Sequence, residues 1–200
     1  MSNYVIVTGY TFDTDYVAAA NNLVQSCNRL NVPVLSYGYQ SLGEWTKNTM
    51  VKSKIILEAL TSQDRDVIWL DADAEMKSYP LLFDKLADQC DISFRYHRGI
   101  ELLSGTLYLK NNEVVRNLVK EWSEVTEVNW DQRILQELIE GPYKNKLVIY
   151  PLPEEYVKIN PRDNEFKQLE CVIGHKQMSR QQRKTIGYEQ PKKFKRLHKR

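Results

Sequence analysis

Two aspartates, Asp71 and Asp73, follow an apolar run at residues 67–70. Such a run predicts a strand buried on both faces, and side chains alternate along a strand, so we expect the two carboxylates to point the same way. Like charges held that close repel unless a cation or a proton lies between them. Mg²⁺ and Mn²⁺ take oxygen ligands and commonly join one or two carboxylates to the phosphates of a substrate. The pattern therefore favours a divalent-metal site over an acidic turn or a helix N-cap.

Strands and helices alternate in the part of the chain that must position this pair. Residues 4–8 and 32–36 predict apolar strands, which are closed by Gly9 and Gly38 respectively. Residues 14–30 predict a helix with Asp13 or Thr14 as its cap, and residues 51–60 predict a second helix by their apolar spacing. With the strand at 67–70, this order is typical of a doubly wound parallel sheet, in which ligands bind beyond the carboxyl ends of the strands.

The second half of the chain continues the mixture of strands and helices. We expect helices at residues 81–86, 111–125 and 131–139, and strands at residues 91–96, 102–109 and 147–150. Gly105 interrupts one of these strands, which indicates either a β-bulge or a place where a ligand meets the backbone. The fold class is therefore α/β, with a mostly parallel central sheet flanked by helices in one domain.

Length and composition exclude several classes of protein. Two hundred residues suit one domain, and no apolar run is long enough to cross a membrane. The chain enters its first strand almost at once, without a signal segment, so we expect a cytoplasmic location. The three cysteines, Cys27, Cys90 and Cys171, are widely spaced, which indicates reduced thiols and argues against a zinc site or a disulfide framework.

The small net charge of +2 conceals a division along the chain. Residues 176–200 hold ten Lys or Arg and one Glu, about +9, which leaves residues 1–175 at about −7. A basic tail on an acidic body favours a polyanionic partner such as nucleic acid. The alternative, which the sequence leaves equally open, is a solubilising terminus or one that folds back on the acidic body.

An ordered series of motifs resembles the nucleotide-diphospho-sugar glycosyltransferases of the GT-A fold, in a compact form like those of phages and bacteria. The resemblance covers residues 4 to about 183, as a domain at 1–180 followed by a basic tail at 181–200. The motifs are Val-Thr-Gly-Tyr at 7–10, Lys54, Trp-Leu-Asp-Ala-Asp-Ala at 69–74, Leu-Leu-Ser-Gly-Thr-Leu at 102–107, Trp-Asp-Gln at 130–132 and Ile-Gly-His-Lys-Gln-Met-Ser-Arg at 173–180. The order and spacing of these motifs are more specific than any one of them.

The resemblance implies a nucleotide-sugar donor held with Mn²⁺ or Mg²⁺. Asp73 would bind the metal directly and His175 would complete its shell, while Asp71 would reach the ribose, or the metal through water. The other donor contacts that it implies are Thr8, Gly9 and Tyr10 at the nucleoside, Lys54, Gln177 and Arg180 near the phosphates, and Ser104 and Gly105 at the sugar.

The resemblance also implies sugar or acceptor contacts for Asp131 and Gln132. Asp131 is the candidate for a catalytic base, and the overall pattern favours the branch of the family that retains anomeric configuration. Each role has a simpler alternative: Asp131 as a helix N-cap, His175 as a turn histidine, Gly9 as a turn residue and Lys54 as a solvated lysine.

Two other classes of protein share single features with this chain. Phosphohydrolases of the haloacid dehalogenase type also place Asp-X-Asp after an apolar strand, but normally after the first strand and with Thr or Val after the second acid, where this chain has Ala74. A non-catalytic nucleic-acid-binding protein would depend on the tail alone. Within the glycosyltransferase interpretation, we expect the acceptor to be a hydroxymethylated pyrimidine in phage DNA, with a lipid-linked or cell-surface saccharide as the alternative.

Overall fold

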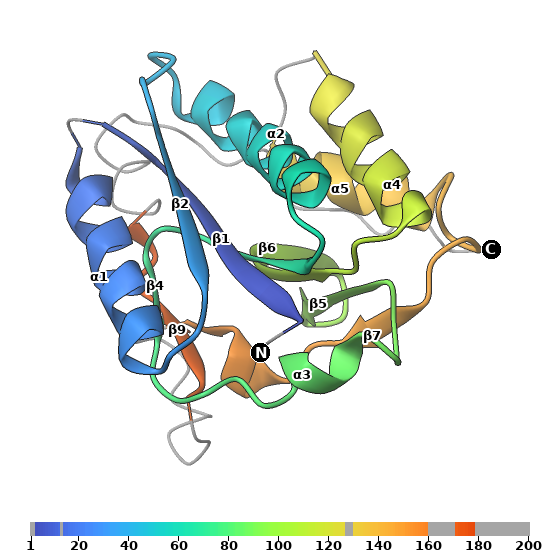
Figure 1. Ribbon diagram of the computed structural model, residues 1–200. Helices are drawn as coiled ribbons and strands as arrows, with labels where there is room; N and C mark the ends of the chain where they lie inside the picture. Colours follow the sequence, from blue (N-terminus) through green and yellow to red (C-terminus); the bar gives the residue numbers. More distant parts are fainter. Residues whose placement is uncertain (1–2, 13, 127–129, 160–170, 179–200) are drawn as a thin grey trace.

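The computed structural model describes residues 3–12, 14–126, 130–159 and 171–178. The central sheet consists of β1 (Tyr4–Thr11), β2 (Val34–Tyr39), β3 (Asp66–Leu70), β5 (Ile92–His97), β6 (Glu101–Leu109) and β7 (Ile149–Pro151). Its strand order is β2-β1-β3-β6-β5-β7 (Figure 1). Within this sheet, β6 runs antiparallel to both of its neighbours and the other strands share one direction. The α/β domain with a mostly parallel sheet is therefore confirmed.

Helices cover both faces of this sheet. They are α1 (Asp15–Arg29), α2 (Trp45–Ser62), α3 (Phe83–Leu86), α4 (Glu113–Glu124) and α5 (Asp131–Glu140), with a 3-10 turn η1 (Glu154–Tyr156). Helices α2, α4 and α5 group together, apart from α1 (Figure 1). A second sheet of order β4-β9-β8 joins β4 (Ala74–Met76) to β9 (Ile173–His175) and β8 (Lys158–Ile159). This small sheet brings the end of the described chain next to the aspartates after β3.

Alternation along the strands divides the core into two layers. Val5, Val7 and Trp69 belong to a cluster that includes apolar residues of α2, α4 and α5. Tyr4 and Ile6, which point the other way, belong to a cluster that includes residues of α1 and α3. Because apolar side chains point both ways from β1 and β3, these strands are buried on both faces, as expected of parallel strands.

Two elements differ from the sequence prediction in a way that matters for the site. Helix α2 begins at Trp45, well before the predicted start near residue 51. Strand β3 ends at Leu70, and the chain turns sharply, with the N–H of Ala74 donating to the carbonyl of Asp71 at 2.8 Å. Asp71 and Asp73 therefore belong to a turn, and the alternation rule used to orient them does not apply.

Helix capping corrects one alternative assignment. Thr14 caps α1 by accepting from the N–H of Tyr16, as predicted. Trp130 occupies the N-cap position of α5, so Asp131 is the first residue of the helix and its carboxylate is not the cap. That carboxylate is buried and has another partner.

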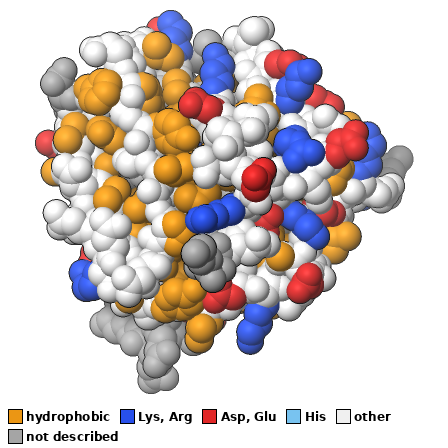
Figure 2. All heavy atoms as spheres, viewed as in Figure 1, with side chains coloured by type: hydrophobic (Ala, Val, Ile, Leu, Met, Phe, Trp, Pro, Cys, Tyr) orange, Lys and Arg blue, Asp and Glu red, His pale blue; other side chains and the backbone are white. Residues whose placement is uncertain are grey.

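On the face shown in Figure 2, the described surface has no large patch of charges of one sign. Lys, Arg, Asp and Glu are interspersed over α2, α4 and α5, and the half over β1 and β2 shows few charges. No helix among the described residues is long and apolar enough to span a membrane.

Candidate active site

A cleft of about 870 Å³ opens beyond the carboxyl ends of β1 and β3. This is the edge at which open α/β sheets bind ligands. Most of the residues predicted to form the site line this cleft: Gly9, Tyr10, Asp71, Asp73, Ser104, Gly105, Asp131, Gln132, His175 and Gln177. Residues far apart in the sequence therefore come together as the motif order predicts.

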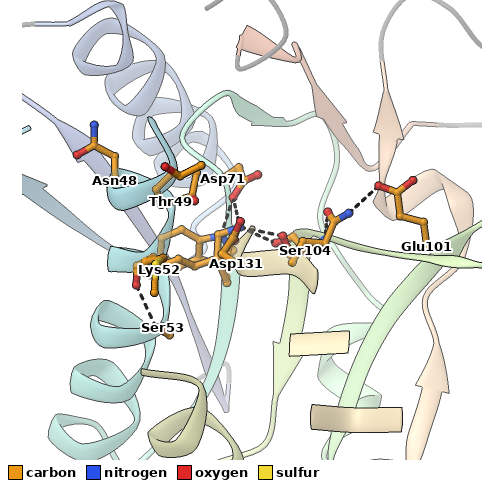
Figure 3. Close-up of polar contacts among 12 residues, drawn as sticks. Asn48, Thr49, Lys52, Ser53, Asp71, Glu101, Ser104 and Asp131 are labelled. Atoms are coloured by element: carbon orange, nitrogen blue, oxygen red, sulfur yellow. Dashed lines mark hydrogen bonds and ion pairs between the residues drawn. The ribbon is translucent and has the colours of Figure 1, made fainter. Parts of the chain in front are cut away.

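A lysine that the sequence analysis did not select lies at the centre of the cleft. Lys52 Nζ lies 2.9 Å from Asp131 Oδ2 and 3.1 Å from Asp71 Oδ1 (Figure 3). It also donates to Ser104 Oγ at 2.9 Å and to the Ser104 carbonyl at 3.3 Å. Burial by itself lowers the pKa of Lys52, but Asp131 and Asp71 together raise it above its ordinary value. Lys52 therefore carries a fixed positive charge.

Lys54, which was predicted to face the diphosphate, does not line the cleft. It is exposed on α2, whereas Lys52 lies on the apolar face of that helix with Ile55, Ile56 and Ala59. Residues three and four positions apart share a helix face, so a lysine on this apolar stripe was a signal available in the sequence. The correction replaces Lys54 by Lys52 as the lysine at the site.

Asp71 is oriented by the core beneath it. The indole Nε1 of Trp69 donates to Asp71 Oδ1 at 2.8 Å, and the N–H of Asp71 donates to the carbonyl of Gly105 at 2.9 Å. Trp69 is buried, yet it also lines the cleft, so it serves both core and site. The oxygen Oδ1 of Asp71 therefore has Trp69 and Lys52 as its partners. The other oxygen, Oδ2, lies on the side of Gly105 and His175.

The corner that the sequence predicted to bind a metal, called the metal corner below, is formed by Asp73 and His175, both of which are buried. The pairing of β4 with β9 places Ala74 opposite His175, and this brings the side chain of Asp73 close to that of His175. Asp73 Oδ1 lies 3.7 Å from His175 Nδ1, and Asp73 Oδ2 accepts from the N–H of Met178 at 2.8 Å. Burial raises the pKa of Asp73, but His175 in its charged, doubly protonated form and the Met178 N–H outweigh it and hold that pKa below its ordinary value.

This donor set fits a hard divalent cation. One carboxylate oxygen and one imidazole nitrogen face each other at a distance too long for a hydrogen bond. No group of three or more His, Cys, Asp or Glu suited to a metal occurs among the residues that the structure describes. Mg²⁺ and Mn²⁺ typically take few protein ligands and complete their shell with water and phosphate oxygens, so two protein ligands are consistent with such a site.

Gly105 lets the strand approach this corner. A Cβ built on Gly105 would lie 3.2 Å from His175 Cε1 and 3.3 Å from Asp71 Oδ2. These contacts are tighter than most that real Cβ atoms make, so the absence of a side chain keeps the space between Asp71 and His175 open. Gly105 thus gives two protein side chains room to approach the strand, and the pairing of β6 with β5 also changes register between Leu103 and Tyr108, which agrees with the irregularity predicted there.

Both polar atoms of the Gln132 side chain form hydrogen bonds with residues that line the cleft. Its Oε1 accepts from the N–H of Ser104 at 3.2 Å, and its Nε2 donates to Glu101 Oε1 at 2.9 Å (Figure 3). Glu101 also lines the cleft, and sequence reasoning missed it because no motif contains it. Gln132 therefore connects α5 to β6 and orients Glu101.

The nucleoside candidates at the end of β1 separate into two groups. Gly9 and Tyr10 line the cleft, whereas Thr8 is fully buried beneath it and does not. A Cβ on Gly9 would lie 2.5 Å from Ile55 Cδ1 and 3.2 Å from the ring of Trp69, so a side chain there would press on the packing of α2 against β1. Tyr39, with a pKa raised to about 12 chiefly by burial, is a further aromatic residue of the cleft lining.

The last predicted phosphate contacts are placed only in part. Gln177 lines the cleft with a left-handed backbone at φ 54°. Arg180 lies outside the described residues, as does the whole basic tail at 181–200.

No family model and no curated protein matches this sequence. Solved structures do match. A glycosyltransferase involved in the glycosylation of the major capsid of PBCV-1 matches with a TM-score of 0.63 at 13% identity, covering 92% of this chain and 97% of that one. The glycosyltransferase GlyE of Streptococcus pneumoniae TIGR4 matches at 0.56 and 16% identity, covering 86% of this chain.

Mouse xyloside xylosyltransferase 1 matches at a TM-score of 0.54 and 10% identity, over 88% of this chain and 98% of that one. The present chain spans about half of GlyE, of which 54% is covered. At identities this low, the likeness shows a shared fold. All three structures are of glycosyltransferases. The chain therefore has a GT-A-like glycosyltransferase fold.

Proposed function

We propose that this protein is a metal-dependent glycosyltransferase that moves a sugar from a nucleotide-diphosphate sugar to a hydroxyl acceptor. The observation that carries the proposal is the arrangement of the cleft. Asp73 and His175, a buried pair suited to a cation, lie beside Lys52 and its two carboxylate partners, at the edge where sheets of this kind bind ligands.

Asp73 and His175 would hold Mn²⁺ or Mg²⁺, with Asp71 Oδ2 close to the same corner. When bound, the metal supplies Lewis-acid stabilisation of the negative charge that develops on the leaving diphosphate. Gln177 and the segment that leads to Arg180 follow His175 directly, so they are proposed to contact the phosphates. Tyr10 and Tyr39 offer aromatic surface for the nucleoside.

The charge around Lys52 suits the reacting sugar. Lys52 with Asp71 and Asp131 has a formal charge of −1, because one ammonium is shared between two carboxylates. An anomeric carbon becomes oxocarbenium-like as its bond to oxygen breaks, and nearby negative charge stabilises it. Lys52 keeps Asp131 and the Ser104 hydroxyl in fixed positions, where they bind the hydroxyls of the donor sugar.

The acceptor is proposed to enter over the hairpin formed by β5 and β6. Strand β6 extends beyond the end of β3, since Leu70 pairs with Thr106 while Glu101 pairs with His97 of β5. Glu101, Leu103 and Gly105 alternate toward the cleft, which continues to His97 and Trp130. This half of the cleft lies beyond the metal corner, and its carboxylate at Glu101 suits an acceptor hydroxyl.

The same features favour retention of configuration and disfavour hydrolysis of phosphate esters. An inverting enzyme needs a base that accepts a proton, whereas Asp131 is paired with Lys52 and the carboxylate of Glu101 accepts a hydrogen bond from Gln132. A phosphohydrolase of the dehalogenase type needs a nucleophilic aspartate at the end of its first strand, where this chain has Thr8, Gly9 and Tyr10.

For the acceptor itself we propose hydroxymethylated pyrimidine in phage DNA. The support is the charge of about +9 over residues 176–200, which suits a phosphate backbone. The alternatives are a lipid-linked or cell-surface saccharide, and a virion glycan of the kind named for the PBCV-1 enzyme with which the fold is shared. The mixed charges in Figure 2 indicate that the described face shown there adds little to nucleic-acid binding.

A donor panel tests this function. Sugar nucleotides are incubated with the protein and Mn²⁺, and release of nucleotide diphosphate and the thermal shift are measured. We expect one donor to be hydrolysed or to stabilise the protein, and EDTA to abolish both effects. Sugar transfer to hydroxymethylated DNA, together with salt-sensitive DNA binding, would support the DNA acceptor. Function that survives Asp73→Ala but is lost on deleting residues 185–200 would instead indicate a non-catalytic nucleic-acid-binding protein.

A further inference from the structure

A buried hydroxyl contacts the proposed metal ligand from behind. Thr106 of β6 is fully buried, and its Oγ1 lies 2.8 Å from His175 Nε2. The same Oγ1 lies 3.1 Å from the carbonyl oxygen of Tyr156, in hydrogen-bonding geometry. Thr106 thus lies between the histidine of the cleft and the backbone of η1.

The position of the histidine proton follows from these contacts. A carbonyl oxygen only accepts hydrogen bonds, and a threonine hydroxyl has one hydrogen to donate. Thr106 therefore donates to Tyr156 and accepts from His175, so the proton of the neutral imidazole lies on Nε2. The other nitrogen, Nδ1, then carries a lone pair on the side of Asp73, at a distance of 3.7 Å that is too long for a hydrogen bond.

The carbonyl that receives the Thr106 hydrogen is itself well fixed. The Tyr156 side chain is buried, its hydroxyl accepts from the N–H of Leu82 at 3.0 Å, and its ring packs edge-on against Phe83 at 5.1 Å. The core therefore fixes the final acceptor, and donation runs from His175 through Thr106 to the Tyr156 carbonyl of η1.

We propose that Thr106 is a positioning residue that holds His175 in its Nε2–H form, so that Nδ1 is free to bind a divalent cation with Asp73. This inference rests on the metal site of the proposed function. Groups that bond the second nitrogen of a ligating histidine fix its tautomer and orientation, and their loss commonly lowers metal affinity about 10- to 100-fold. Without the hydroxyl, a proton on Nδ1 shared with Asp73 becomes the better arrangement, and the lone pair is lost to the metal.

Nitrogen NMR of the metal-free protein at pH 8 tests the tautomer directly. In the wild type we expect the His175 ring to carry its proton on Nε2. In Thr106→Val, which keeps the side-chain shape but removes the hydroxyl, we expect this preference to be lost, and Thr106→Ser should restore it. A wild-type ring protonated on Nδ1 would overturn the inference.

Manganese binding tests the consequence without any catalysis. Mn²⁺ alone is titrated into each variant and the free ion is followed by electron paramagnetic resonance. We expect Thr106→Val to weaken binding by about tenfold and Thr106→Ser to bind like the wild type. Ser93→Ala is the matched control, because it removes another buried hydroxyl of the same sheet that lies outside the cleft lining.

The outcomes separate the two proposals. Unchanged Mn²⁺ affinity in folded Thr106→Val would overturn the positioning role while the metal site stood. A wild-type protein that has the Nε2–H ring but binds no Mn²⁺ would overturn both the metal site and the role assigned to Thr106 toward it. Thermal unfolding of each variant confirms that the comparison is made between folded proteins.

Discussion

Lys52 and Asp131 form a buried ion pair that joins α2 to the first turn of α5, with 2.9 Å between Nζ and Oδ2. Asp131 has an exposed fraction of 3% and Lys52 of 8%, so neither charge has water as an alternative partner. The carboxylate also lies at the N-terminus of a helix, where negative charge is stabilised. This pair connects the proposed donor site to the packing of the domain.

Replacing Lys52 by Met should therefore affect both activity and stability. The substitution leaves Asp131 buried without its cation, and breaking a buried pair in this way costs about 3 kcal/mol in the free energy of unfolding. Loss of a fixed charge and of the Ser104 contacts should lower kcat/KM at least about 100-fold. Urea unfolding and donor turnover measure the two effects.

The matched control for this experiment is Lys54→Met on the same helix. Lys54 is exposed and does not line the cleft, so we expect stability and turnover close to those of the wild type. Equal losses in both variants would contradict the assignment of Lys52 to the site.

Asp73 should show a defined dependence on pH. Its pKa lies below the ordinary value of 3.8, so the ionised carboxylate stabilises the folded state at neutral pH. Because the folded pKa is the lower one, this contribution is complete well above pH 3.8 and is lost as the pH falls through the folded pKa. The difference in unfolding free energy between wild type and Asp73→Asn should be larger at about pH 5 than below pH 3.8, where it shrinks as the carboxylate is protonated.

Denaturant titrations of both proteins across this range measure the difference. They are done without metal and with EDTA, so that the result reports the carboxylate alone. A difference that grows as the pH falls would mean that the folded protein raises the pKa of Asp73, and the description of the metal corner would then be wrong.

The strands and the approximate position of the site were predictable from local pattern. Apolar runs ending in Asp71 or Gly9 mark strand ends, and strand ends meet at one edge of a mostly parallel sheet. The directions of Asp71 and Asp73 were not predictable in this way, because the chain turns at Ala72–Ala74 and each carboxylate meets different partners. Orientation there depends on tertiary contacts with Trp69 and Met178.

The sequence pointed to Lys54 alone, whereas the structure places Lys52 in the cleft, and the reason is similar. Lys54 agreed with the motif spacing, but only the rotation of α2 against β1 decides which lysine faces the cleft. The apolar neighbours of Lys52 contained that information, since Ile55, Ile56 and Ala59 define the inward stripe. The role of Glu101 could not be predicted from local sequence, because its side chain is oriented by Gln132 of α5, which is distant in the chain.

Gly105→Ala should close the metal corner while leaving the fold intact. The new Cβ meets His175 and Asp71 at 3.2–3.3 Å, and overpacking of this size costs about 1–3 kcal/mol. A shift of either side chain misplaces the donor, so turnover should fall about 100-fold. Mn²⁺ titration and donor turnover measure the change.

Gly174→Ala provides the comparison on the neighbouring sheet. Its Cβ would meet nothing closer than Cys171 Sγ at 3.4 Å, which is ordinary contact, so we expect Mn²⁺ affinity to be retained. If Gly105→Ala bound Mn²⁺ and turned over donor as the wild type does, the corner beside Gly105 would not be the metal site.

Glu101→Gln should separate the acceptor from the donor. The amide oxygen of the new side chain still accepts from Gln132 Nε2, so the packing of α5 on β6 is kept and only the charge is removed. A hydrogen bond to a charged group contributes about 1.5–3 kcal/mol, so the acceptor KM should rise about 10- to 100-fold. Hydrolysis of the sugar nucleotide by water should stay near the wild-type rate, since Glu101 is several residues along β6 from Gly105 and the metal corner.

The two reactions are measured on one preparation, with Glu124→Gln on the exposed end of α4 as the control for loss of a carboxylate. A parallel fall in hydrolysis and transfer would place Glu101 at the donor and move the acceptor site away from the β5–β6 hairpin.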